Sequence, residues 1–382
     1  MSIAGINLSL SIGTLIPSPA PRFIMEALQQ VQIMQTDQGP SGFQISFNAD
    51  RTAGNRRDYA LLESPLLKPQ NRVLLTVTIN GTPYVLMDGF ITQQELSHSS
   101  EFGATSLTVT GEDVSVVMDL YEFSLEYPAL GPPAIALLIL AKYTAIGVIP
   151  EVIPTLVDLV TLPLEWVPQQ NSSDRAYLQQ LAAQHGNVFY VTPGPEPLMN
   201  VAYWGPPIRL FNTPKKALSV DMGVATNVQS INFRYDALAP TLMHGLIQDA
   251  ESELDLPLLT LNSTRLPPLS RNPAVLANQP FVRNNQYTSP KGFTYIEALD
   301  NAQSITNLST DQVVTAQGEL DTLRYGEVLS ARGLVGVRGA GDTYDGLYYI
   351  QSVTHTISRN AYKQQFSISR DGTGSLVSTV QS

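Results

Sequence analysis

Alternating apolar and polar residues around Asn80-Gly81 constrain the fold of this chain more than any other feature of the sequence. The strand expected before this pair has an apolar residue at every second position: Val73, Leu75, Val77 and Ile79. Asn and Gly both tolerate a positive φ, so the pattern predicts a tight hairpin that buries one face. Residues 84–87, 31–47 and the alternation of 106–110 extend this prediction to an antiparallel, half-buried sheet.

A similar unit recurs near the C-terminus. Residues 88–92 open a strand that is expected to bend and return through 106–113. Residues 345–358 follow the same course, turn at Arg359-Asn360, and return through 365–372. We predict two related sheets in one chain, although alternation alone does not separate a repeat from two unrelated hairpins.

Between these units the pattern becomes helical. Ser172, Ser173 and Asp174 are N-cap candidates for a helix with its apolar face on Tyr177, Leu178, Leu181 and Ala182, and Gly186 is placed to end it. Residues 188–191 and 198–204 are expected to form a hairpin that packs on this helix. The sequence therefore predicts a smaller α+β domain over 120–212.

From Ala237 to Gly318 the chain is rich in Pro and Asn and poor in periodicity, as expected for a linker or for an irregular arm that lies on a neighbour. The apolar residues of 256–259 and Phe281-Val282 favour the arm. Four acidic residues, Asp249, Glu251, Glu253 and Asp255, are expected to face a neighbouring subunit from it.

The fold class predicted is α+β, mainly β, with two tube-like antiparallel β-barrel domains, an inserted smaller domain and a long irregular arm. The expected division is a first tube-like domain over 1–119, the α+β domain over 120–212, a return strand over 213–236, the arm over 237–318, a second tube-like domain over 319–372 and a tail over 373–382.

Composition narrows the classes of function. Charged residues make up only 14%, which suggests that neighbouring subunits cover much of the surface. The net charge is −11 and no basic run exceeds two residues, so nucleic-acid recognition is not expected. The apolar stretch 134–141 is too short to cross a bilayer, which needs about 20 residues. The N-terminus has no positive region typical of a signal peptide, so synthesis and assembly in the cytoplasm are expected.

The search for chemistry finds no catalytic, cofactor or metal site. There is no cysteine, and His98, His185, His244 and His355 are isolated from one another. His185 is expected in the last turn of its helix and His355 in a core or interface. Residues 339–346 lack the helix of a phosphate loop and the final carboxylate of a calcium loop, so a hairpin turn is predicted there. No nucleophile elbow occurs.

Three segments together resemble hub proteins of contractile machines: the phage late control protein D family, the hub of T-even phages and the hub part of type VI spike proteins. They are 72–113, 174–190 (DRAYLQQLAAQHGNVFY) and 346–371. Residues 41–47 and 203–207 look most similar to hubs of extracellular or cell-anchored contractile injection systems.

The resemblance implies a homotrimeric baseplate hub, a component of a phage-tail-like particle, that joins a sixfold inner tube to a threefold spike. Its partners would be the inner tube protein, other baseplate subunits and a separate spike protein, since the chain ends soon after the second unit. Arg370, Asp371 and Gly372 are expected to face the spike. The acidic balance is expected to line the lumen.

Two alternatives stay open. One is a particle-associated cell-wall or carbohydrate hydrolase, which would need two carboxylates in a cleft. The other is a β-rich adhesin, although the aromatic residues lie mostly within predicted strands.

Overall fold

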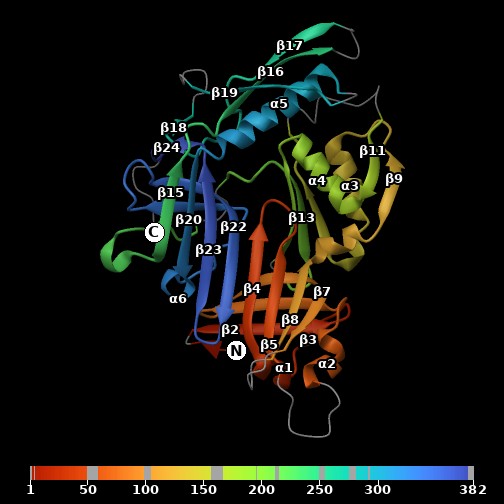
Figure 1. Cartoon of the computed structure of the whole chain (residues 1–382), viewed down its shortest axis with the longest axis vertical. Helices are drawn as coiled ribbons and strands as arrows, with labels where there is room; N and C mark the ends of the chain where they lie inside the picture. Colours follow the sequence, from red (N-terminus) through yellow and green to blue (C-terminus); the bar gives the residue numbers. More distant parts are fainter. Residues whose placement is uncertain are drawn as a thin grey trace.

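The computed structural model describes residues 2–3, 5–49, 59–98, 105–155, 167–194, 196–210, 215–248, 254–274, 281–290 and 293–376. A 14-stranded sheet forms its centre, with the main order β1-β2-β6-β7-β8-β5-β4-β22-β23-β20-β15 (Figure 1). Its strands are β1 Ser2–Ile3, β2 Ile6–Gly13, β3 Ser18–Pro19, β4 Leu28–Thr36, β5 Gly42–Asn48, β6 Arg72–Ile79, β7 Thr82–Ser97, β8 Ser106–Asp113, β14 Leu218–Ser219, β15 Val228–Tyr235, β20 Val314–Asp321, β21 Leu334–Arg338, β22 Gly346–Ser358 and β23 Tyr362–Arg370.

The predicted hairpin is confirmed. Strands β6 and β7 pair from Arg72↔Phe90 to Ile79↔Thr82, and the turn residues Asn80 and Gly81 have φ of 50° and 86°. The alternating apolar residues of β6 are fully buried in a core that also takes side chains from β2, β4, β5 and β8. Burial of one face of each strand against this core is the driving force that the alternation indicated.

Strand β7 is long and changes partners along its length. Its first half pairs with β6 and its second half, from Gly89 to Ser97, pairs with β8. The first half therefore runs crosswise to β4, β5 and β8, so the sheet folds over its own core (Figure 1). Among the described strands the pairing order stays open, so this unit is a folded-over sheet and not a barrel closed by hydrogen bonds.

The second unit repeats the first. Strands β6-β7-β8-β5-β4 lie in that order in space, and β21-β22-β23-β20-β15 lie in the corresponding order with the same chain succession and the same antiparallel pairing. The second unit has its own core, built around Val335, Tyr348, Ile350 and Ile368. Strand β14, which precedes it, pairs parallel with β21, whereas β2 pairs antiparallel with β6, so the likeness is confined to five strands.

Two bulges recur in the two units, while a third, at Leu86 in β7, has no counterpart in the pairing of β21 with β22. A bulge at Gln29 in β4 corresponds to one at Gln229 in β15, in each case one residue after the strand begins. A second bulge, at Thr92 in β7, corresponds to one at Gln351 in β22. Bulges fix local twist and bend, so two equivalent ones are strong evidence for a true internal repeat.

The backbone before β6 and before β21 supports the same conclusion. Gln70 and Arg332, both in the left-handed region with φ of 76° and 71°, donate their N–H groups to Ile91 and Ile350. The carbonyls of Asn71 and Gly333 then accept from the N–H groups of those two isoleucines. A positive φ costs energy in residues other than Gly, so its recurrence at one position is not a general property of hairpins.

An α+β domain follows β8. It contains β9 Glu122–Glu126, β10 Val148–Val152, β11 Gln169–Ser173, β12 Val188–Pro193, β13 Asn200–Gly205, α3 Pro132–Ala141 and α4 Asp174–Gln184, with short 3-10 turns at Val114–Asp119 and Thr144–Ile146. Ser173 caps α4 by accepting from the N–H of Ala176 at 3.2 Å. Gly186, with φ of 61°, follows its end. Trp204 is fully buried between the sheet and the helices.

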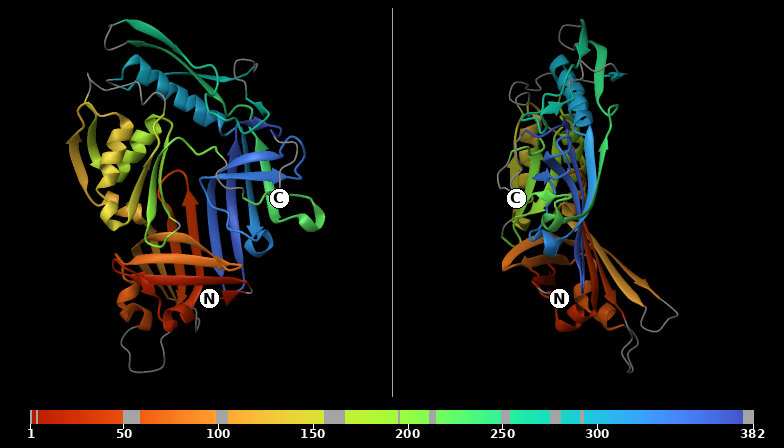
Figure 2. Two further views of the ribbon diagram at one scale, coloured as in Figure 1. Left: turned by 180° about the vertical axis from the view of Figure 1, so that it is seen from behind. Right: turned by 90° about the vertical axis from the view of Figure 1, so that its left-hand side faces the viewer.

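The expectation of an irregular arm over 237–318 is wrong for much of that segment. It contains β16 Thr241–Gln248, β17 Asp255–Leu259, β18 Asn272–Pro273, β19 Arg283–Gln286 and α5 Tyr295–Thr310, and β16, β17 and β19 form a small sheet that packs on α5. This module lies at the far end of the molecule from β1 (Figures 1 and 2). The expected domain boundary at 319 falls inside β20, which starts at Val314.

The remaining elements are short: α1 Arg22–Ala27, α2 Ala60–Glu63, η1 Pro65–Leu67, η4 Gly223–Ala225, α6 Thr322–Tyr325 and β24 Gly372–Thr373. The helices in the described part of the chain are all too short or too polar to span a bilayer.

Candidate assembly interface

The two units meet at one seam, where β4 pairs antiparallel with the second half of β22. The register runs from Ser352↔Thr36 to Ser358↔Gln30. Core-facing side chains at this seam are fully buried, including Val31, Ile33 and Ile357. Strand pairing therefore makes the two units one continuous sheet.

His355 is one of the buried groups at the seam. It faces Ile33, is fully buried, and its Nδ1 lies 2.9 Å from the hydroxyl oxygen of Tyr362. Burial lowers its pKa to about 3, with a smaller contribution from the charge of Lys215. The imidazole is therefore neutral at physiological pH, and the expectation of a core or interface histidine is confirmed.

The opposite face of the sheet is polar and continuous across the seam. Gln32 of β4 pairs with Gln44 of β5 on one side and with Thr356 of β22 on the other. Further residues on this face are Gln30, Ser46, Thr108, Thr110, Thr354, Gln365 and Ser367. Its charged residues include Glu95 of β7, and most of the others lie in pairs of opposite sign: Glu319 with Lys363 at 2.6 Å, and Arg234 with Asp236 at 3.0 Å. Apart from the exposed Met34, this face is hydrophilic and carries few unpaired charges.

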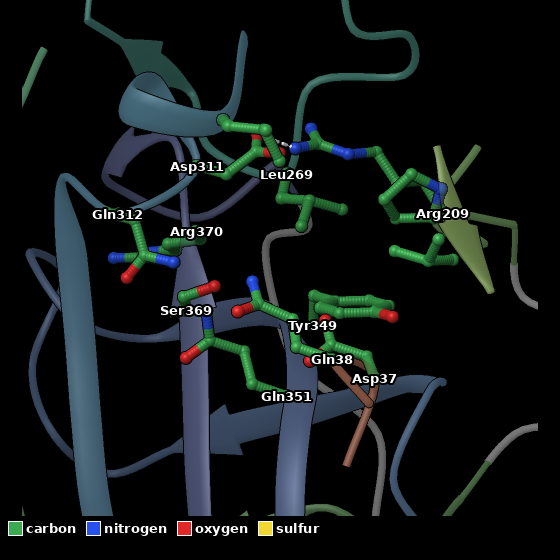
Figure 3. A pocket seen from close by; sticks show the side chains of 13 residues that line it. Asp37, Gln38, Arg209, Leu269, Asp311, Gln312, Tyr349, Gln351, Ser369 and Arg370 are labelled. Atoms are coloured by element: carbon green, nitrogen blue, oxygen red, sulfur yellow. Dashed lines mark hydrogen bonds and ion pairs between the residues drawn. The ribbon is translucent and has the colours of Figure 1, made fainter. Parts of the chain in front are cut away.

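A second polar feature is a buried cluster around a small cavity where the two units meet the segment that follows β13 and the end of α5 (Figure 3). Arg209 forms ion pairs with Asp311 and, at 3.2 Å, with Asp371. Arg265 approaches Asp311 from another side, at 3.1 Å. Burial raises the pKa of Asp311, and the two arginines oppose that shift. The cluster ties four parts of the chain together.

Asp37 lines the same cavity from the turn after β4. Burial raises its pKa to about 6, against the opposing charge of Arg332. Asp37 and Asp311 are the two carboxylates that line this cavity, and the hydrolase alternative would need such a pair. Both lie in the interior: Asp37 is 8% exposed, and Asp311 is paired with two arginines. Leu269 and Tyr349 line the same cavity. This geometry favours a structural role over access for a polysaccharide.

The residues predicted to face a spike lie inside the chain. The Arg370 guanidinium donates to the carbonyl oxygen of Asp345 at 2.9 Å and lies over the ring of Tyr348. Asp371 accepts from the N–H of Leu269 at 3.0 Å, and Gly372 pairs with Pro273 between β24 and β18. Their observed contacts are internal, because the end of β23 is covered by 269–273. A spike contact at this end stays a prediction.

Of the four acids predicted to face a neighbour, Asp249, Glu251 and Glu253 lie outside the described residues, and Asp255 is exposed at the start of β17. His185, expected in the last turn of its helix, is the C-cap residue just after the end of α4, with Nδ1 3.0 Å from Asp300 of α5. In the described residues no three His, Cys, Asp or Glu side chains gather as metal ligands.

The residues that sequence reasoning missed are arginines. Arg332 donates to the carbonyl oxygen of Thr36, to that of Val191 and to the hydroxyl of Ser41, at 2.7–3.0 Å, and so joins both units to the α+β domain. Arg209 and Arg265 hold the buried cluster. Their partners are distant in the sequence, so no local pattern indicated them.

This architecture is the fold of bacteriophage tail proteins. The chain is similar to the tail protein of Neisseria meningitidis, with a TM-score of 0.64 and 14% identity over 96% of this chain and 97% of that one. A 43 kDa tail protein of the prophage MuSo2 from Shewanella oneidensis gives 0.63 and 14% over 95% and 98%. An E. coli component of the type VI secretion system, described as similar to tail proteins of bacteriophage T4, gives 0.54 and 11% over 90% and 73%.

No family model and no curated protein matches the sequence. The likeness is therefore one of structure, and it confirms that the chain resembles tail and spike-related proteins as the three sequence segments indicated.

Proposed function

We propose that the chain is a non-enzymatic structural subunit of a phage-tail-like particle, the baseplate hub that joins the inner tube to the spike. The observation that carries this proposal is the repeat of five strands with the same order, the same register and the same two bulges. The fold shared with tail proteins supports it.

The repeat gives the chain a property that a symmetry adapter needs. A homotrimer of chains with one unit each offers three equivalent surfaces, but with two similar units each it offers six. Six similar sheets can meet a sixfold tube, while differences between the two units leave a threefold arrangement for a separate spike protein. The low content of charged residues, 14%, fits a subunit that is covered by neighbours.

The polar face of the sheet would form the wall of the passage in such a ring. Gln, Thr and Ser dominate this face, and Glu319 is neutralised by Lys363. The passage would thus have a near-neutral hydrophilic wall, in place of the acidic wall expected from the net charge. An uncharged wall of this kind binds neither cationic nor anionic cargo strongly.

The module of β16, β17, β19 and α5 supports a contact with other baseplate subunits. Leu246, Leu259, Leu261 and Leu266 are exposed on it by 53–82%. Isolated exposed leucines are common, but several on one projecting module favour a protein partner. Asp255, on the same module, is the described member of the acids that we propose to face the neighbouring subunit.

Light scattering tests the oligomer, and tube assembly tests the function. We expect the purified chain to have the mass of three chains and to seed polymerisation of the inner tube protein from the same gene cluster, as followed by turbidity. A stable monomer that neither seeds tubes nor binds the spike protein would overturn the proposal. A cell-wall degradation assay with the same preparation separates it from the hydrolase alternative, which predicts activity that is lost in Asp37→Asn.

A further inference from the structure

The strand pairing at the seam between the two units has an equivalent pair of strands that do not pair within one chain. At the seam, β4 of the first unit pairs with the second half of β22. The equivalent of β22 in the first unit is β7, and the equivalent of β4 in the second unit is β15. Among the described strands, residues 93–97 of β7 pair only with β8, and β15 pairs only with β20. Each therefore has an edge without a strand partner.

We propose that these two edges pair with each other between neighbouring copies of the chain, in the register of the internal seam. This inference rests on the homotrimer proposed above and names its contact surface. The bulges fix the register because they show which residues are equivalent in the two units. Arg234 lies five residues after the bulge of β15, and Met34 lies five residues after the bulge of β4. Glu95 lies three residues after the bulge of β7, and Thr354 lies three residues after the bulge of β22. Met34 faces Thr354, so Glu95 of one copy faces Arg234 of the next.

The chemistry fits on both faces of the sheet. On the polar face the same register gives Gln93 opposite Asp236, Glu95 opposite Arg234 and Ser97 opposite Asn232. Each is a hydrogen-bonding or charge-complementary pair, of the kind that stabilises neighbouring strands. Arg234 and Glu95 are both exposed in the single chain, where the Arg234 side chain is 75% exposed and pairs at 3.0 Å with Asp236, two residues further along the chain.

On the core face the register brings Leu96 opposite Phe233. Their equivalents at the internal seam, His355 and Ile33, are fully buried, whereas Leu96 and Phe233 are only half-buried in the single chain. A register one residue away would place Leu96 opposite a polar side chain, because side chains alternate between faces. Burial of Leu96 against Phe233 and attraction between Glu95 and Arg234 therefore favour the same register of the two strands.

The two edges cannot pair within one chain. Strand β15 lies at one side of the molecule and β7 at the other, with the seam between them, in both opposed views (Figures 1 and 2). Pairing of β15 with β7 of the next copy is a head-to-tail contact, which closes into a ring when the rotation allows. An exposed edge that stayed unpaired would also invite aggregation, which this contact prevents.

Disulfide trapping tests the register directly, because the chain has no cysteine of its own. Facing residues of antiparallel strands have Cα atoms about 4.5–5.5 Å apart, within disulfide range, whereas diagonal neighbours are about 7–8 Å apart. The test variant carries Glu95→Cys and Arg234→Cys. The out-of-register control carries Glu95→Cys and Asn232→Cys. Met34→Cys with Thr354→Cys is the matched positive control, since these residues face each other within one chain.

After mild oxidation we expect the test variant to give a covalent three-chain species on a denaturing gel, reversed by reductant. The positive control should form an intrachain bond without a change in mass, and the out-of-register control should stay largely unlinked. A trimer by light scattering with no link in the test variant overturns the edge pairing and leaves the proposed function standing. A monomer by light scattering overturns both. Two-chain species from Glu95→Cys alone would show that like edges pair, which also contradicts the proposal.

Charge exchange gives an independent readout in the uncrosslinked protein. Glu95→Arg or Arg234→Glu alone places like charges opposite each other, so each should raise the trimer dissociation constant several-fold. The two changes together restore opposite charges and should recover most of that loss. If the double variant dissociates as readily as the worse single variant, Glu95 does not face Arg234.

Discussion

Removal of one member of the buried pair Arg72–Asp88 should destabilise the contact between the first unit and the α+β domain. The guanidinium of Arg72 donates from Nε and Nη2 to the two carboxylate oxygens of Asp88, both at 2.7 Å. The side chains are only 5% and 1% exposed. Asn200, on β13 of the α+β domain, donates to the same carboxylate at 2.9 Å. The pair therefore holds a strand of the domain against β6 and β7.

The expected magnitude follows from this burial. In Asp88→Asn the Arg72 charge stays in the interior without a counter-charge, and loss of one partner of a buried pair costs about 3–5 kcal/mol. Replacement of both, as Arg72→Met with Asp88→Leu, removes the uncompensated charge and should cost clearly less than the sum of the single changes. It leaves the Asn200 amide without its acceptor, a cost of about 1–3 kcal/mol.

Urea unfolding followed by far-UV circular dichroism and tryptophan fluorescence measures these differences, because Trp204 lies in the core of the α+β domain. Glu26→Gln is the matched control, since Arg22 and Glu26 also form a pair at 2.7 Å but are 90% and 61% exposed. This control should change stability by no more than about 0.5 kcal/mol. An effect of Asp88→Asn as small as that, or full additivity in the double variant, would refute the reasoning.

Three further predictions follow from single sites. The pKa of His355 is about 3 in the fold and 6.5 in the unfolded chain, so the unfolded state binds a proton more readily as the pH falls. Between pH 6 and pH 4 the free energy of unfolding of the wild type should therefore fall by about 1.4 kcal/mol per pH unit relative to that of His355→Phe, as measured by urea titration at each pH. Gly318→Ala should destabilise the fold by about 1–3 kcal/mol, because a Cβ there would lie 2.5 Å from the ring of Phe366 and from the Ser230 carbonyl oxygen. The control Gly81→Ala places its Cβ in open space and should show only the strain of its positive φ. Asp371→Asn should lower the thermal midpoint, because Arg209 keeps only Asp311. An unchanged thermal midpoint would show that the Arg209–Asp371 ion pair does not stabilise the fold.

Patterns within short stretches of sequence predicted the elements that are stabilised by contacts between residues close in the sequence. The alternation around Asn80-Gly81 and the cap at Ser173 gave a hairpin and a helix that the structure confirms. Helix α5 was missed because its buried face is built largely from small and polar residues, among them Ala298, Ala302 and Thr306, so that its apolar signal is weak. A signal was present, since Thr294 and Glu297 form a capping box.

The repeat was recognised from the sequence, but its alignment was two residues off in the first strand. The sequence match placed Asp88 with Asp345, whereas the bulges at Thr92 and Gln351 place Asp88 with Leu347. Register is determined by pairing between strands, and the two strands have kept the pairing while their side chains diverged. The open edges at Glu95 and Arg234 could not be inferred from sequence, because an edge is defined by which strands fail to pair.

Image averages of the purified oligomer by electron microscopy test the central claim most directly. Three chains that each contribute two equivalent five-strand units should give a closed ring with threefold symmetry in which six similar β segments surround one passage. A ring of three segments, an open chain of subunits or a particle with one chain would contradict the claim that the duplicated unit converts threefold into sixfold symmetry.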